Sequence, residues 1–272
     1  MEIPAPDSTL LLLPGSNPTA EGVRLIQNLA KLDSYQSKIK LNTKLPLPLC
    51  PCYQDAILGE LGDRLDREGI QFLAVNNALL DREPEAFVAS RCDFDVGKIN
   101  FTAKSGVTRS LTLDAPILIV ECRYKEESTD TRSDRRFAPL DTRARDLGGT
   151  REISRQSDIS QVLHLYQGED LTPLVLIDQE IDYSSLVSGT ENNALWNFRR
   201  LVGTLEQVFE VSADRRLVEL PFAAQRTLVS SSRSSSARDT TNSWLFSNRG
   251  TTDQLSRLIA LTWNTANRRI VA

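Results

Sequence analysis

The chain has 272 residues, of which 40% are hydrophobic and 25% are charged, and its formal net charge is −4. These values are typical of a globular protein with a substantial core, and they exclude a uniformly basic nucleic-acid-binding protein. Four cysteines are too few for a disulfide framework, and no run of 18 apolar residues predicts a transmembrane helix. We therefore expect reduced thiols, no stable membrane insertion, and a cytoplasmic location, or a nuclear one in a eukaryote.

The N-terminal part of the chain combines an irregular stretch with helical patterns. Residues 1–20 contain four prolines and predict an irregular arm. Apolar residues at helical spacing predict helices over 21–33 and 54–68, the second of which ends at Gly69. The residues that follow, 70–75, predict a strand.

The middle of the chain predicts strands. Alternating apolar residues indicate strands over 95–104 and 109–113, joined by a turn at Ser105-Gly106. The second strand leads into the apolar run 116–120, which predicts a buried strand that ends on Glu121.

The segment 126–156 is polar and rich in arginine and aspartate, and it predicts a mobile loop that a ligand orders. Further elements are predicted from apolar spacing and composition: a helix over 158–167, a strand over 173–177, helices over 192–209 and 255–270, and a flexible serine-rich segment over 230–236.

Between residues 54 and 180 the predicted order is helix, three strands, helix, strand. This order resembles the core of the PD-(D/E)xK superfamily, the restriction-endonuclease-like nucleases. The resemblance implies an α/β fold with an αβββαβ core, in which helices flank a central mixed sheet, and with helical additions at both ends. The predicted parts are an N-terminal arm and helix over 1–53, the core over 54–210, and a basic C-terminal extension over 211–272.

A possible metal site follows from the residues at the end of the buried strand. Glu121, Arg123 and Lys125 share one face because strand side chains alternate with period two. In the superfamily, the second core strand supplies an aspartate, and the third carries an acidic residue, one intervening residue and a lysine. Asp95 and Glu121-Cys122-Arg123 match these positions. On adjacent antiparallel strands, the two carboxylates would hold Mg²⁺ or Mn²⁺, which activates a water molecule.

The resemblance adds two residues to the catalytic set and exposes one departure. Glu60 on the first helix and Gln161 on the later helix stand at positions that the superfamily uses. Arg123 stands where the superfamily has lysine, and arginine cannot act as a base. Lys125, two residues further along the same face, is the candidate substitute. The single His164, flanked by leucines, is expected to be a packed or surface histidine rather than a catalyst.

The resemblance implies a Mg²⁺-dependent endonuclease that hydrolyses phosphodiester bonds in DNA. A homodimer would supply the two active sites that a double-strand cut needs. Phosphate contacts are assigned to arginines of the polar segment: Arg132, Arg135, Arg136, Arg143 and Arg145.

Two other functions remain open from the sequence. The departure at Arg123 suggests a catalytically silent module of the same fold that binds nucleic acid or protein. A membrane-active β-hairpin over 95–125 is the second alternative, although residues 117–120 do not alternate as a membrane strand would.

Overall fold

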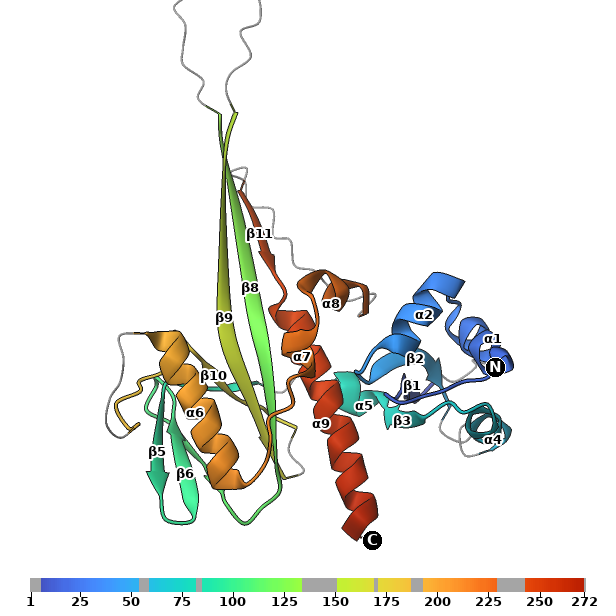
Figure 1. The fold of residues 1–272 in the computed structure, drawn as a ribbon, viewed down its shortest axis with the longest axis horizontal. Coiled ribbons are helices and arrows are strands. Elements are labelled where there is room, and N and C mark those ends of the chain that lie inside the picture. Colours follow the sequence, from blue (N-terminus) through green and yellow to red (C-terminus); the bar gives the residue numbers. More distant parts are fainter. Residues whose placement is uncertain are drawn as a thin grey trace, which may run out of the picture.

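A computed structural model describes residues 6–53, 59–81, 85–133, 151–168, 171–186, 193–228 and 243–271. Within these ranges the strands form three sheets, with helices between and beside them. Two strands of the central sheet extend as a ribbon beyond the other described helices and strands (Figure 1). The prediction of an α/β protein is thus confirmed at the level of a mixed fold.

The N-terminal unit is an antiparallel sheet of order β2-β1-β3 with helices on it. Its strands are β1 (Ser8–Leu12), β2 (Leu47–Cys52) and β3 (Phe72–Asn76), and its helices are α1 (Ala20–Ala30), α2 (Ser34–Asn42), α4 (Glu60–Arg67) and α5 (Asn77–Asp81). The structure confirms the helix predicted over 21–33 and the strand over 70–75. The described part of the helix predicted over 54–68 is α4, since 54–58 lie outside the described residues.

The prediction of an irregular arm over residues 1–20 is wrong for β1. This strand is the central one of its sheet, and Leu10 and Leu11 are fully buried. Pro6 and Pro14 lie on either side of the strand, where they do not remove an N–H group from its ladder. Prolines therefore bound this strand instead of replacing it.

The central sheet has the order β11-β8-β9-β10-β4. Its strands are β11 (Ser243–Ser247), β8 (Ile117–Ser133), β9 (Arg151–Gln167), β10 (Leu174–Ile177) and β4 (Phe87–Ala89). All neighbours are antiparallel except β10 and β4, so the sheet is mixed, and β10 confirms the strand predicted over 173–177. Strands β8 and β9 each have 17 residues and pair without a register shift along their whole length.

The helix predicted over 158–167 is wrong, because this segment belongs to β9. All five residues from 162 to 166 are buried, since both faces of the strand are covered. Val162 and Tyr166 join the core under α9 (Arg249–Val271), whereas Leu163 and Leu165 join the core under α6 (Ala194–Phe209). A strand buried on both faces loses the apolar–polar alternation that would distinguish it from a helix.

The mobile loop predicted over 126–156 is wrong at both of its ends, where residues 126–133 and 151–156 continue β8 and β9. Residues 134–150 lie outside the described residues. We call residues 126–133 and 151–160 the arm, and residues 117–125 and 161–167 its base. Side chains 156–159 of the arm are exposed, whereas the base runs through the core.

The third sheet has the order β5-β6-β7, with β5 (Arg91–Asp95), β6 (Lys98–Thr102) and β7 (Thr108–Thr112). The turn predicted at Ser105-Gly106 is confirmed, and Gly106 has a φ of +84°. The strand predicted over 95–104 is instead two strands, because Gly97 forms a second turn between β5 and β6. Ile99, Phe101 and other residues of this sheet share the core under α6.

The C-terminal part of the chain closes the body. Helices α7 (Arg216–Glu219) and α8 (Phe222–Leu228) follow α6, and β11 then pairs with residues 126–130 of β8. Helix α9 lies between the central sheet and the N-terminal unit (Figure 1). Helices α6 and α9 confirm the helices predicted over 192–209 and 255–270, and the serine-rich segment over 230–236 lies outside the described residues. None of the described helices is both long and apolar enough to cross a membrane.

Gly69 of the N-terminal unit can be tested against Gly97, which lies in the turn between β5 and β6 of the third sheet. Both have positive φ, but a Cβ at Gly69 would lie 2.6 Å from the Asn17 carbonyl oxygen, whereas one at Gly97 would meet nothing within 4 Å. We expect Gly97→Ala to lower the free energy of unfolding by about 1 kcal/mol and Gly69→Ala by at least about twice that. Urea denaturation followed by circular dichroism measures both, and equal losses would contradict the close approach of Gly69 to the backbone of Asn17.

Candidate functional site

The structure does not bring Asp95 and Glu121 together on adjacent strands. Asp95 ends β5 in the third sheet, and Glu121 lies on β8 in the central sheet. The chain changes sheets after β7, and β8 takes β9 as its antiparallel partner instead of β6. Asp95 is exposed, accepts a hydrogen bond of 2.8 Å from its neighbour Val96 N–H, and lies 4.0 Å from Lys98 Nζ.

Glu121 takes part in a network that fixes β8 to the segment after α6. Its Oε2 accepts a hydrogen bond of 3.0 Å from Arg215 Nε, and Arg215 Nη2 donates one of 2.8 Å to Glu206 on α6. The backbone N–H of Glu121 donates to the Asp214 carbonyl at 2.9 Å. The carboxylate that was predicted to hold a metal therefore has a fixed cationic partner.

As predicted, Arg123 and Lys125 share a face of β8. Both side chains lie over the ring of Phe222. The guanidinium carbon of Arg123 is 5.3 Å from the ring centroid and Lys125 Nζ is 5.5 Å from it. Arg123 also donates a hydrogen bond to the Val218 carbonyl, and Lys125 forms an ion pair with Glu127. Both cations contact the body of the protein.

The other predicted catalytic residues lie in two places. Gln161 on β9 stands directly opposite Arg123, and its carbonyl accepts a hydrogen bond of 3.0 Å from Asp178 N–H. Glu60 is the first residue of α4, which is part of the N-terminal unit and not of the central sheet that contains Glu121. Its side chain is exposed. In the part of the chain that the structure describes, no group of three His, Cys, Asp or Glu residues is placed to share a metal ion.

The arginines predicted to contact phosphate fall mainly outside the described residues. Arg132 lies on β8, where it pairs with Glu152 of β9 in the ladder. The description does not extend to the other four, Arg135, Arg136, Arg143 and Arg145.

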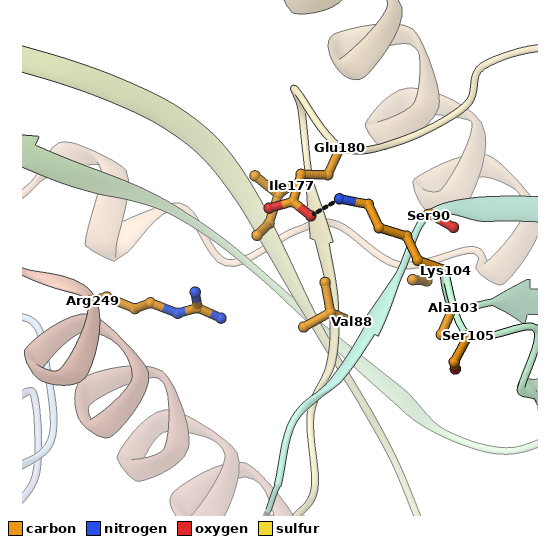
Figure 2. A pocket seen from close by; sticks show the side chains of 9 residues that line it. Val88, Ser90, Ala103, Lys104, Ser105, Ile177, Glu180 and Arg249 are labelled. Atoms are coloured by element: carbon orange, nitrogen blue, oxygen red, sulfur yellow. Dashed lines mark hydrogen bonds and ion pairs between the residues drawn. The ribbon is translucent and has the colours of Figure 1, made fainter.

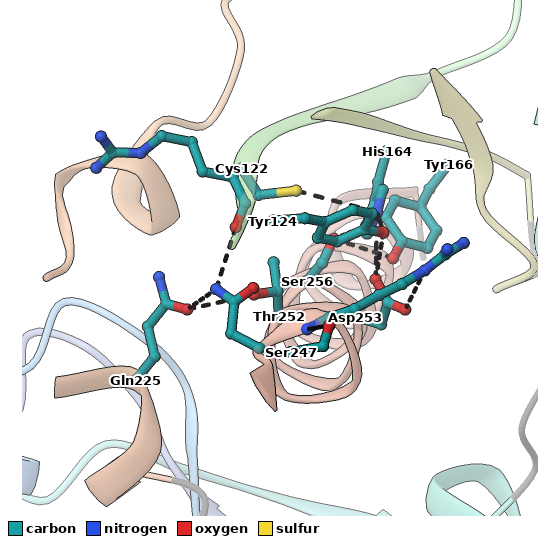
Figure 3. Close-up of polar contacts among 12 residues, drawn as sticks. Cys122, Tyr124, His164, Tyr166, Gln225, Ser247, Thr252, Asp253 and Ser256 are labelled. Atoms are coloured by element: carbon teal, nitrogen blue, oxygen red, sulfur yellow. Dashed lines mark hydrogen bonds and ion pairs between the residues drawn. The ribbon is translucent and has the colours of Figure 1, made fainter. Parts of the chain in front are cut away.

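A polar cluster that sequence analysis did not predict connects the arm's base to α9 (Figure 3). His164 on β9 is fully buried; its Nε2 lies 2.8 Å from the Tyr124 hydroxyl and its Nδ1 lies 2.8 Å from Ser256 Oγ. Tyr124 donates a hydrogen bond of 2.5 Å to Asp253 Oδ1, and the Tyr166 hydroxyl lies 3.0 Å from Ser256 Oγ. We call these five residues the anchor cluster.

The donors and acceptors of the anchor cluster fit one arrangement of protons. Because Tyr124 gives its only proton to Asp253, its oxygen must accept from His164, which places the imidazole proton on Nε2. His164 Nδ1 then accepts from Ser256, whose oxygen accepts from Tyr166. Each of the five polar side chains of the anchor cluster therefore has a hydrogen-bond partner, which makes their burial tolerable.

Burial also sets the protonation states of the anchor cluster. The pKa of His164 is lowered to about 3, first by burial and then by the nearby Arg249 guanidinium. Burial raises the pKa of both tyrosines, and it raises the pKa of Asp253 against the opposing effects of the Tyr124 hydrogen bond and Arg249. His164 is therefore neutral at physiological pH.

Ser, His and Asp also form the nucleophilic triads of hydrolases, but the anchor cluster cannot act in that way. A triad serine must reach a substrate carbonyl, and both Ser256 and His164 are fully buried. The cluster instead joins two elements, since three of its members lie on the paired strands β8 and β9 and two lie on α9. The spacing of Asp253 and Ser256 on one helical face was the signal in the sequence that could have indicated such a connection.

Asn248 makes a second connection between β8 and α9. It lies between β11 and α9, its side-chain oxygen accepts from Lys125 N–H at 2.7 Å, and its backbone N–H donates to the Lys125 carbonyl at 3.2 Å. Its amide nitrogen donates to the Arg123 carbonyl and to Gln225 Oε1. Asn248 thus substitutes for a strand residue at the edge of β8, and the arm's base is held at this edge as well.

A cavity of about 340 Å³ opens between β4, β10, the β6–β7 turn and the start of α9 (Figure 2). Three of its polar side chains already have partners: Lys104 Nζ donates to Glu180 Oε2 at 2.7 Å, and Ser90 Oγ donates to the Thr102 carbonyl at 3.2 Å. The Lys104 side chain is 69% exposed, so this ion pair lies in solvent. The cavity offers no buried, unsatisfied group to a ligand among the residues that line it.

Comparisons with protein-family models, with curated proteins and with solved structures gave no match to this chain. The functional argument therefore rests on the geometry of the arm and of the anchor cluster.

The single histidine allows a direct test of the anchor cluster. We expect the imidazole resonances of the folded protein not to titrate between pH 8 and pH 5, and the ring ¹⁵N shifts to show the Nε2–H tautomer. Because the folded pKa lies below the unfolded value of 6.5, the unfolded state binds the proton first as the pH falls. His164 should therefore reduce stability by about 1.4 kcal/mol per pH unit below about pH 6.

His164→Phe isolates this effect from that of Asp253, whose raised pKa acts in the opposite direction at low pH. The pH dependence of unfolding, measured in urea, should be shallower in the variant between pH 7 and pH 5. A histidine that titrates near pH 6.5 in the folded protein would disprove its burial in a neutral form.

Tyr124→Phe tests the connection to α9. The variant removes the donor to Asp253 and the acceptor for His164, so we expect it to lower the free energy of unfolding by about 1–3 kcal/mol. Tyr35, which is 73% exposed, provides the control, and Tyr35→Phe should change stability by less than about 0.5 kcal/mol. Equal effects of the two variants in urea denaturation would show that the anchor cluster does not stabilise the fold.

Proposed function

We propose that this chain is an assembly protein that acts by binding, and that its β8–β9 arm engages another protein. The observation that supports this proposal is the contrast along the two strands. The base is buried between α6 and α9 and fixed by the anchor cluster, whereas side chains 156–159 of the arm are exposed. An arm of this kind is held in a defined direction and presents its surface away from the body (Figure 1).

The arm's own stability supports a binding role. A ribbon of two strands is only marginally stable in water, because it has no third strand and no packed layer to bury apolar area. Beyond Asp130, β8 has only β9 beside it in the described chain, and the arm of β9 has only β8. Another chain that covers the arm would supply the missing neighbour, so binding and ordering of the arm would be coupled.

The charge of the segment favours a protein partner over a nucleic acid. Residues 126–156 contain seven arginines and seven acidic residues, so the segment has no net charge. Binding to DNA or RNA depends on cationic groups that replace the counterions of the phosphates, and this arm has no excess of them. A balanced set of charges suits the specific ion pairs and the polar rim of a protein interface.

Metal-dependent DNA cleavage stays a prediction. Of its proposed residues, Arg123, Lys125 and Gln161 lie near one another, but Glu121 is paired with Arg215 and Asp95 lies in another sheet. Activity would require Glu121 to leave Arg215 and a second carboxylate to take the place of Asp95.

Two truncations test the assembly function. Glu126 and Asp158 form an opposed pair, as do Asp130 and Ser154, so a two-residue Asn-Gly turn can replace either 127–157 or 131–153. The shorter deletion keeps all the β8 residues that pair with β11. In extracts of the source cells, the full chain should elute in an assembly larger than the monomer, and the 127–157 deletion should elute as a monomer.

The exposed Trp196→Ala variant on α6 is the matched control, and it should elute with the full chain. Circular dichroism and thermal unfolding establish that each deletion retains the body. A full chain that elutes as a monomer, or a 127–157 deletion that remains in the assembly, would contradict the proposal.

The nuclease prediction is tested on the same proteins. Purified full chain is incubated with supercoiled and linear DNA in Mg²⁺ or Mn²⁺, beside Glu121→Gln and Asp95→Ala. The assembly function predicts no cleavage that depends on these residues. Metal-dependent cleavage that both variants lose would replace it with the endonuclease.

A further inference from the structure

Along the arm, the outer edge of β9 carries backbone groups that no described strand pairs. The orientation of these groups follows from the contacts at the base. Asp178 N–H donates to the Gln161 carbonyl, so the backbone groups of Gln161 point away from β8 and toward β10. Because β8 and β9 pair without a bulge, the groups of every second residue in the arm, 151, 153, 155, 157 and 159, point the same way.

The other side of the ribbon confirms this alternation. On β8, the outward groups are those of Ile119, Glu121 and Lys125, which bond to Asp214 and Asn248. Odd residues of β8 stand opposite odd residues of β9, so the outward groups of both strands are their odd residues. Even residues of β9 therefore bond to β8, and the odd residues of β9 in the arm direct both N–H and C=O to an edge that no described strand covers.

This free edge is long and regular. It runs from residue 151 to residue 160, since β10 begins to pair at Val162, and no other described strand lies beside it. Of the other strands at a sheet edge in the described chain, none exceeds six residues, whereas this edge has ten and contains neither proline nor glycine. Natural sheets protect such edges, because an unpaired edge is a template for a further strand.

We propose that the occupant of this edge is the β9 strand of a second copy, paired antiparallel about a two-fold axis at Gln156. This inference rests on the proposed assembly function and names the partner of the arm. The result is a continuous sheet of order β8-β9-β9-β8 across the two copies.

The geometry of the edge permits this pairing. A two-fold axis perpendicular to the sheet keeps each residue on its own face, so opposed residues must both be odd or both be even. With the axis at Gln156, residue 155 stands opposite 157 and residue 153 opposite 159, and all four have outward backbone groups. The axis also lies at the middle of the free edge, so the two edges overlap along nearly all of their length.

The sequence favours this register over its neighbour. With the axis at Gln156, Ile153 stands opposite Ile159, and Asp158 stands opposite Ser154. With the axis at Arg155, the two copies of that arginine would face each other, and Glu152 would face Asp158. Like charges directly opposite each other destabilise a strand pair, whereas paired β-branched residues stabilise it.

Ile159 supports the same register. Its side chain is 45% exposed on the arm, where the described chain does not cover it. Pairing with a second copy would bury part of this side chain. One strand edge buries less than the roughly 1,200 Å² of a small stable interface, so we expect a dimer that dissociates on dilution.

Single cysteines test the register. In the proposed pair, Gln156 stands opposite its own counterpart at a non-hydrogen-bonded position, where Cβ atoms are about 4.5–5.5 Å apart. Asp158 is the control, because its counterpart would lie about 13 Å away along the strand. The background is Cys50→Ser, since the other three native cysteines are buried. Mild oxidation should give a covalent dimer with Gln156→Cys, and at least about tenfold less with Asp158→Cys.

Backbone substitution tests the edge. Ser157→Pro removes an outward N–H group without removing a bond to β8, whereas Ser157→Ala keeps that group and is the matched control. In sedimentation equilibrium, the wild-type chain and Ser157→Ala should form the same reversible dimer. Ser157→Pro should raise the dissociation constant at least about tenfold and keep the circular dichroism spectrum of the wild type.

Three results would overturn the second copy as partner: a purified chain that remains monomeric at all concentrations, equal crosslinking at positions 156 and 158, or a dimer that Ser157→Pro does not weaken. A monomeric chain whose cellular assembly is lost in Ser157→Pro would identify a strand of a different protein as the occupant. In that case the assembly function would stand, and the present inference would fall.

Discussion

Burial of β9 on both of its faces is the constraint on which the rest of the structure depends. Leu163 and Leu165 face the core under α6, while Val162, His164 and Tyr166 face α9. The polar members of the second face are tolerated because the anchor cluster satisfies each of them, and His164 stays neutral there. Two helices that are distant in the sequence thus hold one pair of strands, which sets the position of the arm.

The same constraint explains the contacts that the charged residues at the end of the apolar run make. Glu121 and Arg123 stand where β8 passes from the core toward the arm, and their partners lie on the chain that follows α6. These contacts stabilise the edge of β8, so the residues that suggested phosphodiester chemistry contribute to holding the arm's base. Side chains 156–159 of the arm stay exposed while the base is held in the core, and the proposed function of binding rests on this contrast.

The sequence predicted the elements whose two sides differ. Helices α1, α6 and α9 present one apolar face each, and the turn at Gly106 depends on local backbone chemistry. Strand β9 was missed for two reasons: over 158–167 it resembled a helix because its base is buried on both faces, and over 151–156 it resembled a loop because that part of the sequence is mainly polar. The separation of Asp95 from Glu121 depends on the change of sheet after β7, which alternation within single strands cannot reveal. Direct hydrogen bonds in the anchor cluster join residues up to 129 positions apart, so the sequence could suggest only that His164 is a packed or surface residue and could not name its partners.

Residue-resolved amide hydrogen exchange along β8 and β9 tests the central claim most directly, in the dilute monomer and in the assembled state. The account predicts slow exchange throughout the base in both states. In the arm of the monomer, the odd residues of β9 should exchange fastest, and assembly should slow them selectively. Exchange in the monomer's arm that is as slow as in the base, or that assembly leaves unchanged, would contradict an arm that is anchored at one end and completed by a partner at the other.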